Sequence, residues 1–214
     1  MTILSGPSWG PASGAKPKQL VVLCHGVGAD GRDLIELAPI FGATLPDAMF
    51  IAPNAPEPYD MAPFGRQWFS IGDINPAKLG QGVRRAAKVL DAFLDAELAR
   101  LGLSSYALVG FSQGAMTALF TGLRRAQAPS AILAYSGALI DPQSLAAEIQ
   151  NHAPVLLAHG ESDDIVPAFR SRDAAASLRE AGIPVELVFS PGLGHGIDEA
   201  GLQAGAALLR RVFT

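Results

Sequence analysis

Six short runs of apolar residues, separated by segments with helical spacing, constrain the fold of this chain more than any other feature. The runs are rich in Val, Leu and Ile and occupy residues 19–25, 48–52, 106–111, 131–136, 154–159 and 184–190. Their apolar character is continuous rather than alternating, as a strand that is covered on both faces requires. We therefore predict buried, parallel strands at these positions.

Helical patterns lie between most of these runs. Residues 79–101 repeat apolar side chains every three or four positions, and 113–125, 169–181 and 202–212 are interpreted in the same way. The alternation of strands and helices predicts an α/β fold, with a mostly parallel sheet, helices on both faces and right-handed crossovers. In such sheets, ligands bind at the carboxyl ends of the strands.

The length of 214 residues fits one domain, 1–214, and leaves little room for a large lid domain. Apolar residues make up 49% of the chain and charged residues 17%, which indicates a packed core and argues against disorder. Residues 1–18 are rich in Gly, Pro and Ser, so we expect an irregular lead-in or a short edge strand there.

Charge and cysteine content narrow the function classes. The net charge of −4 disfavours a nucleic-acid partner, which usually binds to a basic stripe. No run approaches the ~18 apolar residues of a membrane span, and the N-terminus lacks the pattern of a signal peptide. Cys24 is the single cysteine, so no internal disulfide can form and a reducing compartment fits. We expect a cytoplasmic protein without stable membrane insertion.

The strongest chemical signal is the G-x-S-x-G motif at residues 110–114, with Ser112 at its centre. The motif follows a predicted strand and opens a predicted helix, as a nucleophile elbow requires. Such a turn lifts the hydroxyl above the sheet, and the helix N-terminus offers N–H groups to a developing oxyanion. We predict that Ser112 is a nucleophile. The alternative is a glycine-rich turn with a solvated serine.

A serine nucleophile needs a base, and the base needs an orienting acid. The expected chain order of serine, acid and histidine removes His25. His152 precedes a strand and lies at the wrong end, and His159 would need an acid from an earlier segment. His195 follows the last predicted strand in a glycine-rich loop. We predict that His195 is the base, against the alternative of a solvated surface histidine.

The acid is expected in the loop that follows the fifth apolar run. We choose Asp163, although spacing alone leaves Asp163 and Asp164 about equal. Glu161 is a neighbour that could simply be solvated. Asp141 and Asp198 are further alternatives, but each could instead cap the helix that follows it.

Two backbone N–H groups are predicted to form the oxyanion hole. One belongs to Gln113, directly after the nucleophile, and we assign the other to Val27 in the glycine-rich loop after the first apolar run. The alternative for that loop is an ordinary strand-to-helix connection. His25 is interpreted as structural or loop-orienting, and Cys24 as a small buried residue.

These motifs resemble the phospholipase/carboxylesterase family of small α/β-hydrolases, which includes acyl-protein thioesterases. The matching segments, in family order, are LCHGVGADG, APNAP, RQWF, GFSQGA, HGESDDIVP and GHGI. The family pattern H-G-x-x-D-x-x-V-P implies that Asp163 is the acid. It also implies Ser112 as nucleophile, His195 as base and the Val27 and Gln113 amides as oxyanion donors. Cys24 stands where the family usually has an apolar residue.

The resemblance implies an α/β-hydrolase fold and a serine hydrolase of carboxylic esters, without metal or cofactor. Thioesters and lysophospholipids remain open as small-molecule or lipid substrates. We hypothesise that Met61, Phe64 and Trp68 line the acyl channel, with the alternative that Trp68 packs in the core. The same apolar segment could support a homodimer. Competing functions are a dienelactone-hydrolase-like enzyme and a non-catalytic binding module.

Overall fold

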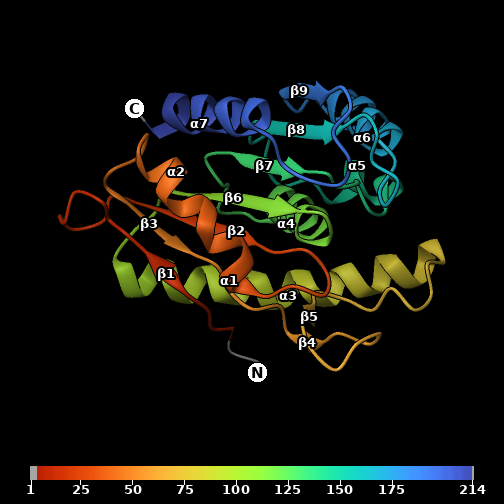
Figure 1. Ribbon diagram of the computed structural model, residues 1–214, viewed down its shortest axis with the longest axis horizontal. Coiled ribbons are helices and arrows are strands. Elements are labelled where there is room, and N and C mark those ends of the chain that lie inside the picture. Colours follow the sequence, from red (N-terminus) through yellow and green to blue (C-terminus); the bar gives the residue numbers. More distant parts are fainter. Residues whose placement is uncertain (1–3, 214) are drawn as a thin grey trace.

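The computed structural model describes residues 4–213 and contains a seven-stranded sheet with helices on both faces (Figure 1). The strand order is β1-β3-β2-β6-β7-β8-β9, and only the β1–β3 pair is antiparallel. The strands are β1 Ser8–Trp9, β2 Gln19–Cys24, β3 Ala48–Ile51, β6 Tyr106–Phe111, β7 Ile132–Tyr135, β8 Val155–Gly160 and β9 Val185–Ser190. A separate small antiparallel pair joins β4 Glu57–Pro58 to β5 Arg66–Gln67. The predicted α/β class with a mostly parallel sheet is confirmed.

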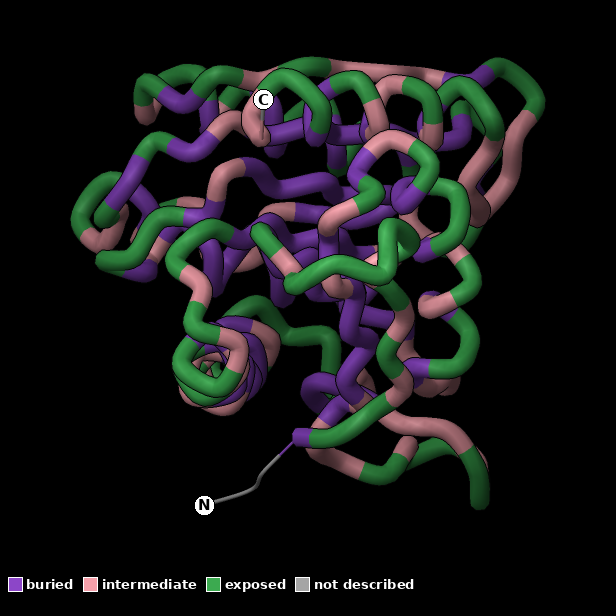
Figure 2. The backbone as a smooth tube through the Cα atoms, turned by 90° about the vertical axis from the view of Figure 1, so that its left-hand side faces the viewer, coloured by how far each residue is buried: buried purple, intermediate pink, exposed green. Residues whose placement is uncertain are grey.

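Two hydrophobic clusters fill the space between the sheet and its helices. Leu20 and Val22 of β2 belong to the cluster beneath α3, α4 and α6, whereas Val21 and Leu23 belong to the cluster beneath α1, α2 and α7. Successive residues of a strand point to opposite faces, and both faces are covered here, so the apolar runs are continuous. Figure 2 shows the buried backbone concentrated at the centre of the molecule.

The helices have the following bounds: α1 Gly31–Leu34, η1 Ile35–Leu37, α2 Ala38–Gly42, α3 Pro76–Leu101, α4 Gln113–Arg124, η2 Pro142–Ser144, α5 Leu145–Glu148, α6 Phe169–Glu180 and α7 Glu199–Phe213. The long helix α3 begins three residues before the predicted start, because the Asn75 side chain caps it by accepting a hydrogen bond from Ala77 N–H. Within residues 4–213, none of the helices is long and apolar enough to cross a bilayer, and no large lid domain lies over the sheet.

The two predicted aspartate caps have different outcomes. Asp198 Oδ1 accepts from Gly201 N–H at 2.9 Å, so this aspartate does cap the last helix. Asp141 makes no side-chain cap to the short helices that follow it. Its carboxylate instead pairs with Arg84 on α3 at 2.7 Å. The capping interpretation of Asp141 was therefore wrong, because a partner from a distant helix takes the carboxylate.

The N-terminal segment runs along one edge of the sheet. Ser8 and Trp9 form β1 and pair with β3, and the Trp9 ring packs edge-on against Phe50 with ring centroids 5.8 Å apart. The expectation for 1–18 also covers residues 1–3, which lie outside the described residues.

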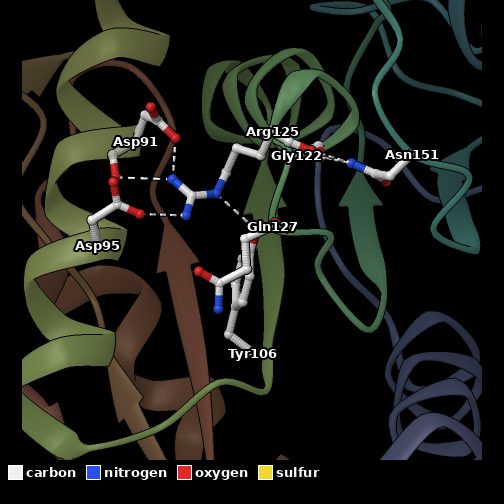
Figure 3. Close-up of polar contacts among 7 residues, drawn as sticks. All are labelled: Asp91, Asp95, Tyr106, Gly122, Arg125, Gln127 and Asn151. Carbon is white, nitrogen blue, oxygen red and sulfur yellow. Dashed lines mark hydrogen bonds and ion pairs between the residues drawn. The ribbon is translucent and has the colours of Figure 1, made fainter.

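A buried arginine fastens helices at the amino ends of the strands (Figure 3). Arg125 directly follows α4, and its guanidinium bonds to Asp91 and Asp95 on α3 and to the Tyr106 hydroxyl. Burial raises the pKa of Tyr106 to about 12, so this hydroxyl keeps its proton and donates to the Gln127 carbonyl. Asn151 Nδ2 donates to two carbonyls at the end of α4, each at 2.8 Å. The cluster lies opposite the sheet edge that carries the candidate site.

Candidate active site

The sheet order places the predicted nucleophile and oxyanion loop at a topological switch point. The chain continues from β2 to β3 on one side, whereas β6 pairs with β2 on the other side and leads to β7, β8 and β9. Ligands bind in the crevice outside the carboxyl ends of two such strands. Ser112 follows β6, and the loop that contains Val27 follows β2.

Ser112 occupies a strained turn. Its φ of 53° is unusual for a non-glycine residue, and its N–H donates to the Tyr135 carbonyl at 2.9 Å. The flanking glycines of the motif allow strand and helix to approach closely. A Cβ at Gly110 would lie 2.4 Å from the Gly114 carbonyl oxygen, and a Cβ at Gly114 would lie 1.9 Å from the Cys24 carbonyl oxygen. Side chains at these two positions would therefore overlap the backbone, which explains why a nucleophile elbow has glycine there.

Asp163 and His195 are joined by a short hydrogen bond. His195 Nδ1 is 2.7 Å from Asp163 Oδ2, and the other carboxylate oxygen accepts from the N–H groups of Ile165 and Val166 at 2.9 and 2.8 Å. The Asp163 side chain is fully buried. Burial alone would raise the pKa of Asp163, but the hydrogen bonds from His195, Val166 and Ile165 lower it overall. The site therefore holds a buried, charged carboxylate.

The His195 ring lies against the nucleophile turn. Its centroid is 4.8 Å from that of Phe111, the residue directly before Ser112. The histidine loop is anchored on both sides, because Ser136 Oγ donates to the Gly196 carbonyl at 3.0 Å and Ser162 N–H donates to the Leu193 carbonyl at 2.9 Å. The structure thus brings the ends of β6, β8 and β9, with the three residues predicted there, to one edge of the sheet.

The loop that contains Val27 lies beside Ser112. A Cβ added at Gly26 would be 3.4 Å from Ser112 Cβ. His25 shapes this loop: its Nε2 accepts from Ala55 N–H at 2.9 Å, and its Nδ1 donates to the Gly26 carbonyl at 2.7 Å. Burial lowers the pKa of His25, which favours the neutral ring that these two bonds need. His25 therefore has a structural position.

Gln113 was predicted only to offer its backbone N–H, but its side chain also makes two hydrogen bonds. Its Oε1 accepts from Trp68 N–H at 2.8 Å, and its Nε2 donates to the Phe69 carbonyl at 2.7 Å. Trp68 Nε1 in turn donates to the His25 carbonyl at 2.9 Å. These bonds tie the start of α4 to the segment after β5 and to the loop after β2. A polar residue in a buried first helical turn was the only sequence signal.

The three predicted channel residues separate into two groups. Met61 and Phe64 are 68% and 74% exposed, in the loop between β4 and β5. Trp68 is 1% exposed and packs in the core, so its interpretation as a channel residue is corrected. Ile165, two residues after Asp163, is 66% exposed and was missed, because its position beside the site depends on how the acid loop folds.

A cavity of about 470 Å³ lies between the start of α3, the loop after β7 and the start of α6. Its apolar lining includes Leu79, Leu139 and Ile140. The loop after β7 also contacts the nucleophile turn, because a Cβ at Gly137 would lie 3.4 Å from the Ser112 carbonyl oxygen. The cavity is therefore one loop away from the candidate nucleophile.

Two observations bear on metal and thiol chemistry. In the part of the chain that the structure describes, no group of three or more His, Cys, Asp or Glu side chains could hold a metal ion. Burial raises the pKa of the Cys24 thiol far above its ordinary value, so this cysteine stays protonated.

Comparison with known proteins identifies the family of this chain. The sequence matches the profile of the Phospholipase/Carboxylesterase family over residues 11–212. Esterase YpfH of Escherichia coli (strain K12) is 29% identical and the match covers 90% of this chain and 82% of that protein. Acyl-protein thioesterase 1 of Schizosaccharomyces pombe is 31% identical over 74% of each chain. The crystal structure of esterase PE8 matches with a TM-score of 0.93 and 46% identity, over 99% of this chain and 100% of that one. The chain therefore belongs to the phospholipase/carboxylesterase family of α/β-hydrolases, and it is a hydrolase.

Proposed function

We propose that this protein is a serine hydrolase that cleaves carboxylic esters through Ser112, His195 and Asp163, with an acyl-enzyme intermediate. The observation that carries the proposal is the 2.7 Å hydrogen bond between His195 and the buried Asp163 carboxylate, beside the strained Ser112 turn. Relatives named esterase, carboxylesterase and acyl-protein thioesterase support ester cleavage.

The proposed reaction has two halves. Ser112 Oγ attacks the acyl carbon while His195 Nε2 accepts its proton, because Nδ1 is already bonded to Asp163. The N–H groups of Val27 and Gln113 stabilise the oxyanion. His195 then donates the proton to the leaving alcohol or thiol, and water releases the acyl group by the same route in reverse.

The acyl chain is proposed to lie against exposed apolar residues of two loops. Ile165 lies in the loop of Asp163, and Met61 and Phe64 lie in the loop between β4 and β5, where Gly65 packs against Gly28 of the loop after β2. Exposed apolar side chains often form a ligand-binding surface. The relatives named acyl-protein thioesterase bring thioesters into the proposed range. Phe64→Ala is expected to change the preference among acyl lengths, and an unchanged profile from C2 to C16 would argue against this assignment.

Hydrolysis of p-nitrophenyl esters and matched thioesters tests the proposal. Replacement Ser112→Ala should lower kcat by ~1000-fold or more, because the nucleophile is lost while the fold is kept. Ser104→Ala is the matched control, since Ser104 is exposed at the opposite end of the sheet. Retention of activity in Ser112→Ala would overturn the proposal.

A further inference from the structure

A second histidine contacts the Asp163 carboxylate, and the mechanism above gives it no role. His159 lies near the end of β8, and its side chain is fully buried. Its Nε2 is 2.7 Å from the Val166 carbonyl oxygen and 3.1 Å from Asp163 Oδ2. Its Nδ1 is 2.7 Å from Ser171 Oγ. Both ring nitrogens therefore have partners.

These partners define where the ring protons lie. The Val166 carbonyl and the Asp163 carboxylate can only accept hydrogen bonds, so Nε2 of His159 carries a proton. In the neutral ring, Nδ1 then accepts the hydroxyl hydrogen of Ser171. Ser171 lies in the first turn of α6 and is itself buried. The helix thus holds the ring in one tautomer and one orientation.

His159 contacts Asp163 Oδ2, which is the carboxylate oxygen that also bonds to His195. Asp163 Oδ1 accepts from two backbone N–H groups, whereas Oδ2 accepts from His195 and also faces His159. His159 also bonds to the carbonyl of Val166, whose N–H donates to Oδ1. The histidine therefore restrains both the carboxylate and the turn that supplies its other donors.

We propose that His159 is a positioning residue for Asp163, and that Ser171 positions His159. The role rests on the proposed function, because it acts through Asp163 on the orientation of His195. Three donors hold the carboxylate: His195 and the N–H groups of Ile165 and Val166. His159 supports this arrangement through its bond to the Val166 carbonyl and its 3.1 Å contact with Oδ2, and a carboxylate held in this way is preorganised to orient the imidazole. His159 does not need to touch the substrate for this role.

The test compares His159→Phe, which keeps a ring in the space, with Ser171→Ala and the control Ser177→Ala on the same helix. His159→Phe should lower kcat for p-nitrophenyl butyrate about tenfold or more, with KM changed less than about twofold, because the buried hydrogen bond to the Val166 carbonyl and the polar contact with the Asp163 carboxylate are both lost. The low-field proton NMR signal of His195 Nδ1–H should shift or broaden in the same variant. Ser171→Ala should change kcat and the signal in the same direction, and Ser177→Ala should leave both as in the wild type.

A folded His159→Phe protein with wild-type kcat and an unchanged low-field signal would overturn the proposal. If that variant does not fold, Ser171→Ala decides alone, and wild-type values for both readouts would overturn the proposal equally. A fluorophosphonate adduct mapped on the wild-type protein separates the two claims. Absence of the adduct from Ser112 contradicts the proposed function, whereas the NMR signal still reports whether His159 restrains the Asp163–His195 pair.

Discussion

The Asp163 carboxylate of the candidate site is buried and stays charged. Burial would raise the pKa of Asp163, yet its hydrogen bonds with His195 and two backbone N–H groups lower it below the ordinary value. The motifs predicted this residue, but spacing alone did not separate Asp163 from Asp164. In the structure, Asp163 is buried against His195, whereas Asp164 is exposed.

This difference predicts unequal effects for two adjacent substitutions. Asp163→Asn should lower kcat by ~1000- to 10,000-fold, as the loss of the acid does in other triads, whereas Asp164→Asn should stay within about twofold of the wild type. Steady-state kinetics on a p-nitrophenyl ester measures both. A larger loss of kcat in Asp164→Asn than in Asp163→Asn would show that Asp163 is not the acid.

The lowered pKa of Asp163 also predicts the shape of the pH profile. A base that accepts the Ser112 proton must be unprotonated, whereas the lowered pKa of Asp163 keeps this carboxylate ionised. The plot of log kcat/KM against pH should therefore have an acid limb with a slope of about one. A slope of two would mean that both groups take up protons in the same range.

Side-chain partners distant in sequence were beyond prediction. Gln113 was assigned only its backbone N–H, because its partners Trp68 and Phe69 lie more than 40 residues earlier. The contact of His159 with Ser171 likewise depends on how α6 packs against the acid loop. Nothing in the spacing of these residues specifies the contacts.

The positions of the strands were predicted well, because a strand that is buried on both faces has a continuous run of apolar residues. Each of the six predicted core strands lies within one residue of its run. Of the helix starts, those of α4 and α6 were predicted at the right residue, whereas α3 begins at Pro76 after the Asn75 cap and α7 at Glu199 after Asp198, each three residues before the predicted start. These first turns are held by polar caps rather than by the apolar spacing that was followed.

The close approach of Gly114 to the Cys24 carbonyl predicts that alanine will have opposite effects at two helical glycines, Gly114 and Gly80. Gly114→Ala should destabilise the protein by about 3 kcal/mol or more, because its Cβ would overlap the Cys24 carbonyl. Gly80→Ala in α3 should instead stabilise by about 0.5–1 kcal/mol, since alanine is the better helix former. A Cβ there meets only ordinary contacts, with Asp141 at 3.7 Å or more. Urea denaturation measures both, and equal effects would contradict the steric explanation of the motif.

Ion pairs join three helices that cover one face of the sheet. Glu148 on α5 bonds to Arg84 on α3 at 2.8 Å and to Arg124 on α4 at 2.7 Å. These two hydrogen bonds lower the pKa of Glu148 to about 2 from its usual 4.5. A carboxylate that is charged in the folded state and has a lowered pKa stabilises the fold above its unfolded pKa.

The stabilising effect of Glu148 should therefore disappear as the pH falls from 4.5 to about 2. Glu148→Gln should lower the free energy of unfolding near neutral pH and flatten its pH dependence over this range. Glu36→Gln is the control, because Glu36 is exposed. Denaturant titrations at several pH values test this, and an unchanged acid limb in Glu148→Gln would refute the assignment.

The most direct measurement is peptide mapping of the covalent adduct that a fluorophosphonate forms with the native protein. The account predicts that the adduct lies on Ser112, is absent from Ser112→Ala, and forms far more slowly in His195→Gln, because the imidazole is needed to activate the hydroxyl. An adduct on another residue, or equally rapid labelling of Ser112 without His195, would contradict the proposed catalytic machinery.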